Sequence, residues 1–175
     1  MIENRETTPW RNVSLFLLVL SVFLLPGRAV SAAGSLTLPA KTWGICFGNS
    51  PRFNGLRFNI ADEKLELING VNITLWKAND KDNKEAGGTV NGLSLGVIPY
   101  AGELNGIQIG LLGAGARKTL RGINLGLIGA GSGGDMTGLN LGGIGVGAGD
   151  RVRGDNIGGL GAGGGGNGLG LNIGG

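Results

Sequence analysis

The chain has 175 residues, a formal net charge of +3 and no histidine. Its length fits one domain, or one domain followed by a repeat array. Without histidine, Ser-His, Cys-His and His-metal arrangements are excluded, and we expect no enzyme, no cofactor and no metal. No run of Lys and Arg forms a stripe for phosphate contacts, so no nucleic-acid partner is expected either.

Residues 1–33 have the order of a secretory signal peptide. Two arginines precede the apolar run 15–25, and a stretch of small residues, 29–33, follows it. The run has about 11 residues, whereas a helix that spans a bilayer needs about 20. We therefore predict export to the cell envelope, the cell surface or the medium, with cleavage near Ala33. An anchor that stays uncleaved is the alternative, and this segment is the only part expected to contact a membrane.

Residues 34–86 form the second predicted segment, an aromatic-containing β segment or cap. Cys46 is the single cysteine, so we expect a small buried side chain rather than a disulfide. The carboxylates of Asp62, Glu63 and Glu66 are expected to form a solvated turn beside Lys64. The polar stretch 77–86 is interpreted as a solvated loop.

Residues 87–175 hold 33 of the 39 glycines and form an array of tandem repeats. Aligned on a recurring glycine, the spacings are 14, 16, 16, 16 and 14 residues for repeats that begin at Gly92, Gly106, Gly122, Gly138, Gly154 and Gly168. Looser matches begin at Gly55 and Gly70. A fixed period this short indicates stacked supersecondary units.

Within each unit, apolar and polar residues alternate as in a strand, and glycines then interrupt the alternation. Leu139 and Leu141 flank Asn140, and the next apolar pair, Ile144 and Val146, follows two glycines. The pattern predicts two strands of about four or five residues joined by two glycine corners. A helix is disfavoured because each interior glycine costs about 1 kcal/mol.

Stacking the units aligns like residues in columns, which predicts an all-β, glycine-rich β-solenoid or β-helix-like array behind the signal-peptide helix. A β-barrel is the alternative, although it favours strands of about 9–11 residues with two aromatic girdles. Three columns are expected to face inward: Leu95, Ile109, Leu125, Leu141, Ile157 and Leu171; Ile98, Leu112, Ile128, Ile144 and Leu160; and Tyr100, Ala114, Ala130, Val146 and Ala162.

A polar column lies between the apolar ones and is expected to face outward, where it is the candidate ligand face. Its members are Ser94, Gln108, Asn124, Asn140 and Asn156. Asp155 interrupts a further column that is expected to face inward, formed by Leu93, Ile107, Ile123, Leu139 and Leu169. Because an unpaired carboxylate is costly to bury, either that column is open to solvent at this repeat or Arg151 or Arg153 pairs with Asp155.

The segments 53–59 and 68–76, followed by repeated Asn-Gly-Leu-x-Leu-Gly units, resemble a family of bacterial surface-repeat proteins. The resemblance covers roughly residues 43–175 and implies an exported protein or lipoprotein of unassigned function, with no catalytic residues. The chain departs from the lipoprotein members because it lacks a cysteine for lipidation.

We therefore expect a non-enzymatic structural or adhesive surface protein. The alternative is a module that binds a glycan or another ligand through the polar column. An unidentified surface partner or a glycan is the expected partner. The last repeat stops at Gly175 within its first strand, so we expect either truncation or self-association at an uncapped C-terminal end.

Overall fold

The computed structural model describes residues 35–76 and 87–175. The predicted signal peptide and the predicted loop 77–86 lie outside the described residues. Within the described ranges the secondary structure is entirely β, and no helix there is long and apolar enough to cross a membrane.

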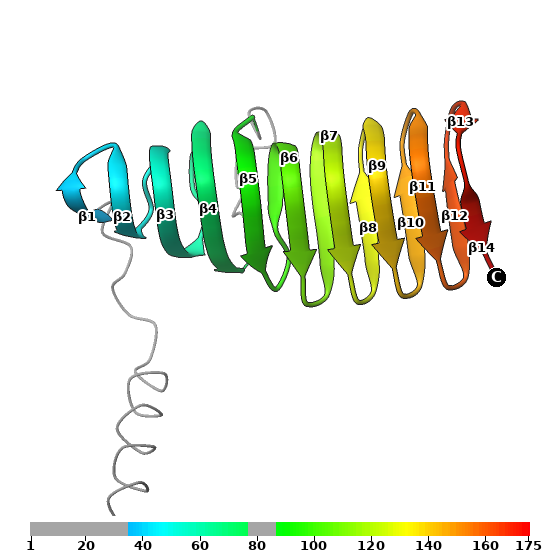
Figure 1. The fold of residues 1–175 in the computed structure, drawn as a ribbon, viewed down its shortest axis with the longest axis horizontal. Coiled ribbons are helices and arrows are strands. Elements are labelled where there is room, and N and C mark those ends of the chain that lie inside the picture. Colours follow the sequence, from blue (N-terminus) through cyan, green and yellow to red (C-terminus); the bar gives the residue numbers. More distant parts are fainter. Residues whose placement is uncertain (1–34, 77–86) are drawn as a thin grey trace, which may run out of the picture. The chain divides into compact units, whose positions relative to one another are not determined.

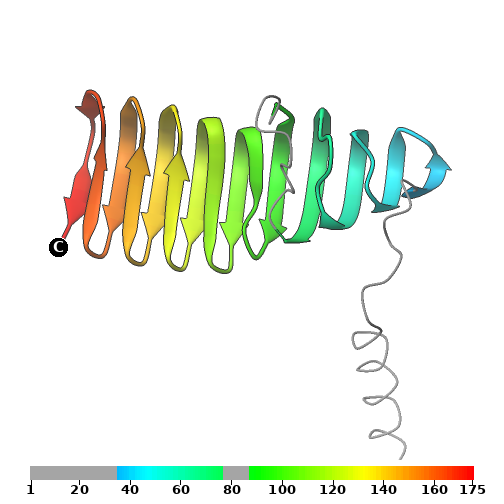
Figure 2. The same ribbon diagram turned by 180° about the vertical axis from the view of Figure 1, so that it is seen from behind.

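One 14-stranded sheet runs through the described residues. Its strands are β1 (Ser35–Ala40), β2 (Trp43–Gly48), β3 (Arg52–Ala61), β4 (Leu67–Trp76), β5 (Thr89–Gly96), β6 (Tyr100–Gly110), β7 (Gly113–Gly126), β8 (Gly129–Ser132), β9 (Asp135–Gly142), β10 (Gly145–Ala148), β11 (Val152–Gly158), β12 (Gly161–Gly164), β13 (Gly168–Leu169) and β14 (Asn172–Gly174). From β2 onward the neighbours are parallel, whereas β1 pairs with β2 in the antiparallel sense. The strands follow one another as stacked coils in both views (Figures 1 and 2), which confirms the β-solenoid prediction.

Each 16-residue coil of the later part combines a long strand with a short one. The long strand β9 has eight residues and pairs with β7 and β11, while the short strand β10 has four and pairs with β8 and β12. We call one coil of the stack, with its long strand, its short strand and the turns between them, a rung. The glycine corners are where they were predicted, but the two strands of a coil differ in length, which the sequence did not indicate.

A column of glycines aligns the rungs. In the described ranges its members are Gly44, Gly55, Gly70, Gly92, Gly106, Gly122, Gly138, Gly154 and Gly170, all with φ between +104° and +130°. A Cβ added at Gly138 would lie 2.0 Å from the carbonyl oxygen of Gly122, and the other members are just as crowded. We call these the column glycines. Both the positive φ and the close backbone approach exclude larger residues.

The apolar core lies two residues before the column glycines. Its column is fully buried and comprises Phe53, Ile68, Val90, Leu104, Leu120, Met136 and Val152. Small side chains of the short strands face it, among them Ala130 and Val146. The buried positions of Ala114, Ala130 and Val146 confirm the predicted small inward column for those residues, and Cys46 is buried as expected.

The expected inward orientation of the leucine and isoleucine columns is wrong. Ile109 is 42% exposed and Ile157 38%, so the column that contains Leu95, Leu125 and Leu141 lies on the outer surface. The second column lies at the turns, where Leu112, Ile128, Ile144 and Leu160 are also exposed. The physical reason is the thinness of the coil: a Cβ at Gly126 would lie 2.0 Å from the carbonyl oxygen of Gly129 in the opposite strand. Leucines do not fit in so narrow a space.

The predicted start of the last repeat, Gly168, is wrong by two residues. Gly170, not Gly168, stacks on Gly154, and Gly168 pairs with Val152. The residue in register with Ile157 is therefore Ile173 rather than Leu171. The Gly-Leu-Gly-Leu sequence at 168–171 allows both alignments, and the asparagine at 172 decides between them because it pairs with Asn156.

Replacing a column glycine will unfold the stack far more readily than replacing an uncrowded glycine of a short strand, such as Gly131. We expect Gly138→Ala to lower the free energy of unfolding by about 3 kcal/mol or more, because φ is +121° and the added Cβ overlaps backbone. Gly131→Ala is the matched control, since its Cβ would meet only an oxygen at 3.6 Å. Denaturant unfolding of both variants measures the difference, and equal losses would contradict the role of the column.

Candidate functional site

The polar column that was expected to form an outer ligand face lies inside the coil. Ser94 is 1% exposed, and Gln108, Asn124, Asn140 and Asn156 are 0% exposed. The expected outward orientation is therefore wrong, because the residues two before and two after each column glycine point to the same side as the core. These five side chains have no surface with which to contact a ligand.

The buried asparagines form a hydrogen-bonded ladder along the stack. The Nδ2 atom of Asn124 donates to Oδ1 of Asn140 at 2.5 Å, and Asn140 donates to Asn156 at 2.6 Å. Asn156 continues the ladder to Asn172 at 2.9 Å. Asn140 and Asn156 also donate to the carbonyl oxygens of their own column glycines. Such pairing offsets the cost of burying an amide and holds each rung in register.

The ladder stops at its N-terminal side. Both amide atoms of Gln108 and the hydroxyl of Ser94 are buried without a hydrogen-bond partner among the described residues. The longer Gln side chain and the shorter Ser side chain break the repeat of identical amides. Burying these polar groups of Gln108 and Ser94 therefore costs free energy that no hydrogen bond offsets.

A buried ion pair occupies the same column near the N-terminal end. Arg57 is 0% exposed, and its Nη1 atom lies 2.5 Å from Oδ1 of Asp62 and 2.9 Å from Oδ1 of Asn72. Asp62 also accepts hydrogen bonds from Asn59 and Thr74. The prediction that Asp62 belongs to a solvated turn is thus wrong, whereas Glu63 and Lys64 are exposed as expected. The network holds β3 and β4 together, and its Arg57, Asp62, Asn72 and Thr74 side chains are buried.

Two columns of apolar side chains cover the outer side of the long strands. The first follows each column glycine: Ile45, Leu56, Val71, Leu93, Ile107, Ile123, Leu139 and Leu171, with Asp155 between the last two. The second lies two residues further on: Phe47, Phe58, Ile73, Leu95, Ile109, Leu125, Leu141, Ile157 and Ile173. We call these two columns the apolar face. Stacked Phe47 and Phe58 rings, 5.2 Å apart, begin its second column.

A groove runs beside the second column of the apolar face. It has a volume of about 520 Å³ and a glycine floor, and its lining includes Ile109, Leu125, Leu141, Leu111 and Leu127. Leu111 and Leu127 stand at the turn, 64% and 69% exposed, and form its outer wall. At the next two rungs the same turn position is Gly143 and Gly159, so the wall ends there.

Asp155 lies on the surface and needs no buried counter-ion. Its column faces outward, and Asp155 is itself exposed. Of the two alternatives considered from the sequence, the open column is therefore the one observed. Arg151 pairs with Asp135 instead.

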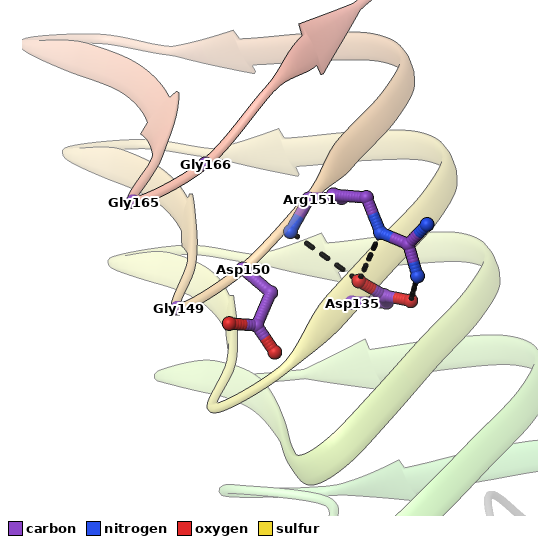
Figure 3. A pocket seen from close by; sticks show the side chains of 6 residues that line it. All are labelled: Asp135, Gly149, Asp150, Arg151, Gly165 and Gly166. Carbon is purple, nitrogen blue, oxygen red and sulfur yellow. Dashed lines mark hydrogen bonds and ion pairs between the residues drawn. The ribbon is translucent and has the colours of Figure 1, made fainter.

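A shallow pocket at the opposite corner of the coil contains this second ion pair. The pocket has a volume of about 360 Å³ and is lined by Asp135, Asp150, Arg151 and three glycines (Figure 3). Arg151 donates from Nη2 to Oδ2 of Asp135 at 2.8 Å and from Nε to Oδ1 at 3.1 Å. The guanidinium is thus already engaged, and the described residues contain no group of three or more Asp, Glu, Cys or His side chains that could hold a metal ion.

Comparison with family models, curated proteins and solved structures found no match to this chain. The apolar face is consequently judged on its own geometry. Sequence reasoning identified the residues of the face from Leu93 to Ile157 as columns but placed them inside the coil, and it did not identify the members before Leu93. The signal that distinguishes the two sides is the column two residues before each glycine, because it is apolar in every repeat from Ile68 to Val152 and shares its side with the asparagines.

Replacing Asn140 will cost more than replacing Gln108, although both are fully buried in one column. Asn140→Leu leaves Nδ2 of Asn124 and Oδ1 of Asn156 unpaired, so we expect a loss of about 2–4 kcal/mol in unfolding free energy. Gln108→Met removes an amide that has no partner, and we expect it to be neutral or stabilising. Denaturant unfolding measures both. A Gln108→Met variant as unstable as Asn140→Leu would show that the ladder is not what stabilises the column.

The Asp135–Arg151 pair makes stability depend on pH at the acidic end. The hydrogen bond from Arg151 lowers the pKa of the Asp135 carboxyl, and the same contact raises the pKa of Arg151. Because the folded pKa of Asp135 is depressed, the contribution is present above the unfolded pKa and is lost as pH falls through the folded value, below about 4. The gap in Tm between the wild type and Asp135→Asn should therefore shrink on acidification. Arg151→Gln should give the same profile, and a gap that is constant with pH would contradict the assignment.

Proposed function

We propose that the chain is a non-enzymatic structural repeat protein, exported to the cell surface or envelope, that attaches to its partner through the apolar face. The observation that carries this proposal is an outer surface of apolar side chains over successive rungs, interrupted at Asp155. The largest apolar patch on a soluble monomer is typically about 300–600 Å², and larger patches mark sites of interaction. Here the patch is a regular product of the repeat rather than a scatter of residues.

The chemistry of the described surface supports attachment over catalysis. Inside the coil the asparagines of the ladder bond to one another, and Arg57 bonds to Asp62. The pocket of Asp135 holds an ion pair that is already formed. Export rests on the order of residues 1–33, and the resemblance to bacterial surface-repeat proteins agrees with it. The polar column, as a buried ladder, gives no support to the alternative of a glycan-binding face.

The proposal is tested by making the apolar face polar without altering strand propensity. The variant Ile109→Thr/Ile123→Thr changes two residues that are 42% and 40% exposed, and Leu67→Thr/Leu169→Thr is the control, with residues 38% and 61% exposed outside the face. In cells that produce the chain, we expect the wild type and the control to be cleaved by protease added to intact cells and to remain with the envelope fraction. The face variant should be released into the medium, severalfold more than the control, with an unchanged Tm.

Two results would contradict the proposal. A wild-type chain protected from external protease in intact cells would exclude surface exposure. Equal retention of the face variant and the control would show that the apolar face is not the means of attachment.

A further inference from the structure

We infer that the apolar face pairs with the same face of a second copy of this chain, in a two-fold arrangement whose axis runs parallel to the strands between the Gly122 and Gly138 rungs. This inference rests on the proposed function, because it needs the apolar face to be a binding surface, and it names a second copy of this chain as the partner. Retention on the envelope then depends on self-association of the chain. Two observations support the inference. The turn beside the face has projecting leucines at two rungs and glycines at the next two, so that two copies can fit together, and the face offers enough area for a dimer.

At the turn that follows each long strand, one position is leucine in two rungs, which forms a ridge, and glycine in the next two, which forms a notch. Leu111 and Leu127 project from the Gly106 and Gly122 rungs, whereas the same position is Gly143 and Gly159 at the Gly138 and Gly154 rungs. A two-fold axis parallel to the strands reverses the order of the rungs and keeps the position along the strand. It therefore sets Leu127 of one copy over Gly143 of the other, and Leu111 over Gly159. The ridge of each copy enters the open end of the other copy's groove.

The same operation matches the rest of the face column by column. Leu125 opposes Leu141 of the second copy, and Ile109 opposes Ile157. Because like columns meet at the regular rung spacing, the side chains can interdigitate as two packed sheets do, about 10 Å apart. In the first column the same operation sets Asp155 opposite Ile107 of the second copy, one rung from the end of the overlap, where water can reach the carboxylate.

The area is sufficient for a specific dimer. Six rungs, from Gly92 to Gly170, overlap in this register. With a rung spacing of about 4.8 Å and about 20 Å of strand and turn across the face, each copy buries roughly 550 Å². The total of about 1,100 Å² reaches the level of about 1,000 Å² that separates biological interfaces from chance contacts.

A second copy fits this face better than a lipid surface does. Aromatic residues that favour a membrane interface are absent from the six overlapping rungs except for Tyr100, which follows a turn. The opposite side of the coil presents glycines such as Gly131 and Gly147 at its outward positions and offers almost no apolar side chain. The ridge of Leu111 and Leu127 and the notch at Gly143 and Gly159 lie at equal distances on either side of the proposed axis.

The decisive experiment is a charge-pair test of the register, using sedimentation equilibrium of the purified chain. The wild type should dimerise, and Leu125→Glu and Leu141→Lys should each weaken self-association by about tenfold or more. Mixed together, L125E and L141K should form a heterodimer, because the two new charges oppose each other across the axis. A mixture of L125E with I109K is the matched control, since those positions are two rungs apart, and it should stay dissociated. L111A/L127A should also weaken the dimer, whereas L67A/L169A should not.

Several outcomes would overturn the inference. They are a wild type that stays monomeric at about 100 μM, a dimer unaffected by L125E, or rescue of L125E by I109K as well as by L141K. A monomeric wild type that floats with phosphatidylcholine vesicles would identify a membrane as the occupant instead. These results can be distinguished from a failure of the proposed function. If the face variant is released from cells but the purified chain is monomeric, only the second copy is rejected. If the chain is a dimer but the face variant stays on cells, only attachment through this face is rejected.

Discussion

The stacking of glycine on glycine within the long strands is the constraint on which the rest of this structure depends. At the column glycines the backbones of adjacent rungs approach so closely that an added Cβ would lie 1.9–2.3 Å from a carbonyl oxygen. Only glycine tolerates both this approach and the positive φ found there. Every rung must therefore place a glycine at the same point. This requirement locks the register and sets residues of equal position on top of one another, so a short repeat becomes a set of columns with uniform chemistry.

The uniform columns explain why amides lie inside and leucines outside. At the turn that ends each long strand, glycines such as Gly142 and Gly158 face the opposite strand with no room for a side chain. Next to them only a short polar side chain fits, and asparagine is suited because its amide donates and accepts along the stack. At the wider end, two residues before the column glycine, Leu120 and Met136 fill the core. The remaining apolar residues of the repeat have no interior left to occupy, and they form the apolar face.

Much of the fold was predictable because periodicity and glycine chemistry are local properties. The class of fold, the 16-residue period, the glycine corners and the small column around Ala130 follow from them. Strand alternation, however, shows which residues share a side and not which side is buried. Hydrophobicity favours the leucine side of the strand as the buried one. That prediction is wrong because the coil is too thin for leucine. The contact between Arg57 and Asp62 was also hidden, since it joins residues whose side chains meet only after β3 has turned. The groove and its leucine wall could not be predicted either, because they exist only when the leucine columns face outward.

A coil with a polar ladder inside and an apolar face outside divides two tasks that a globular core combines. The ladder and the column glycines determine register, since a shift of one residue would leave amides unpaired and side chains against backbone. In the proposed dimer, the apolar face determines association. At about 25 cal/mol per Å², burying roughly 550 Å² per copy corresponds to about 14 kcal/mol for each, before the costs of association are subtracted. Because a partner that binds only the folded chain also stabilises it, the stability of the coil and the occupancy of its apolar face are linked. A repeat with so small an interior thus gains from contact with a partner what it cannot gain from its own core.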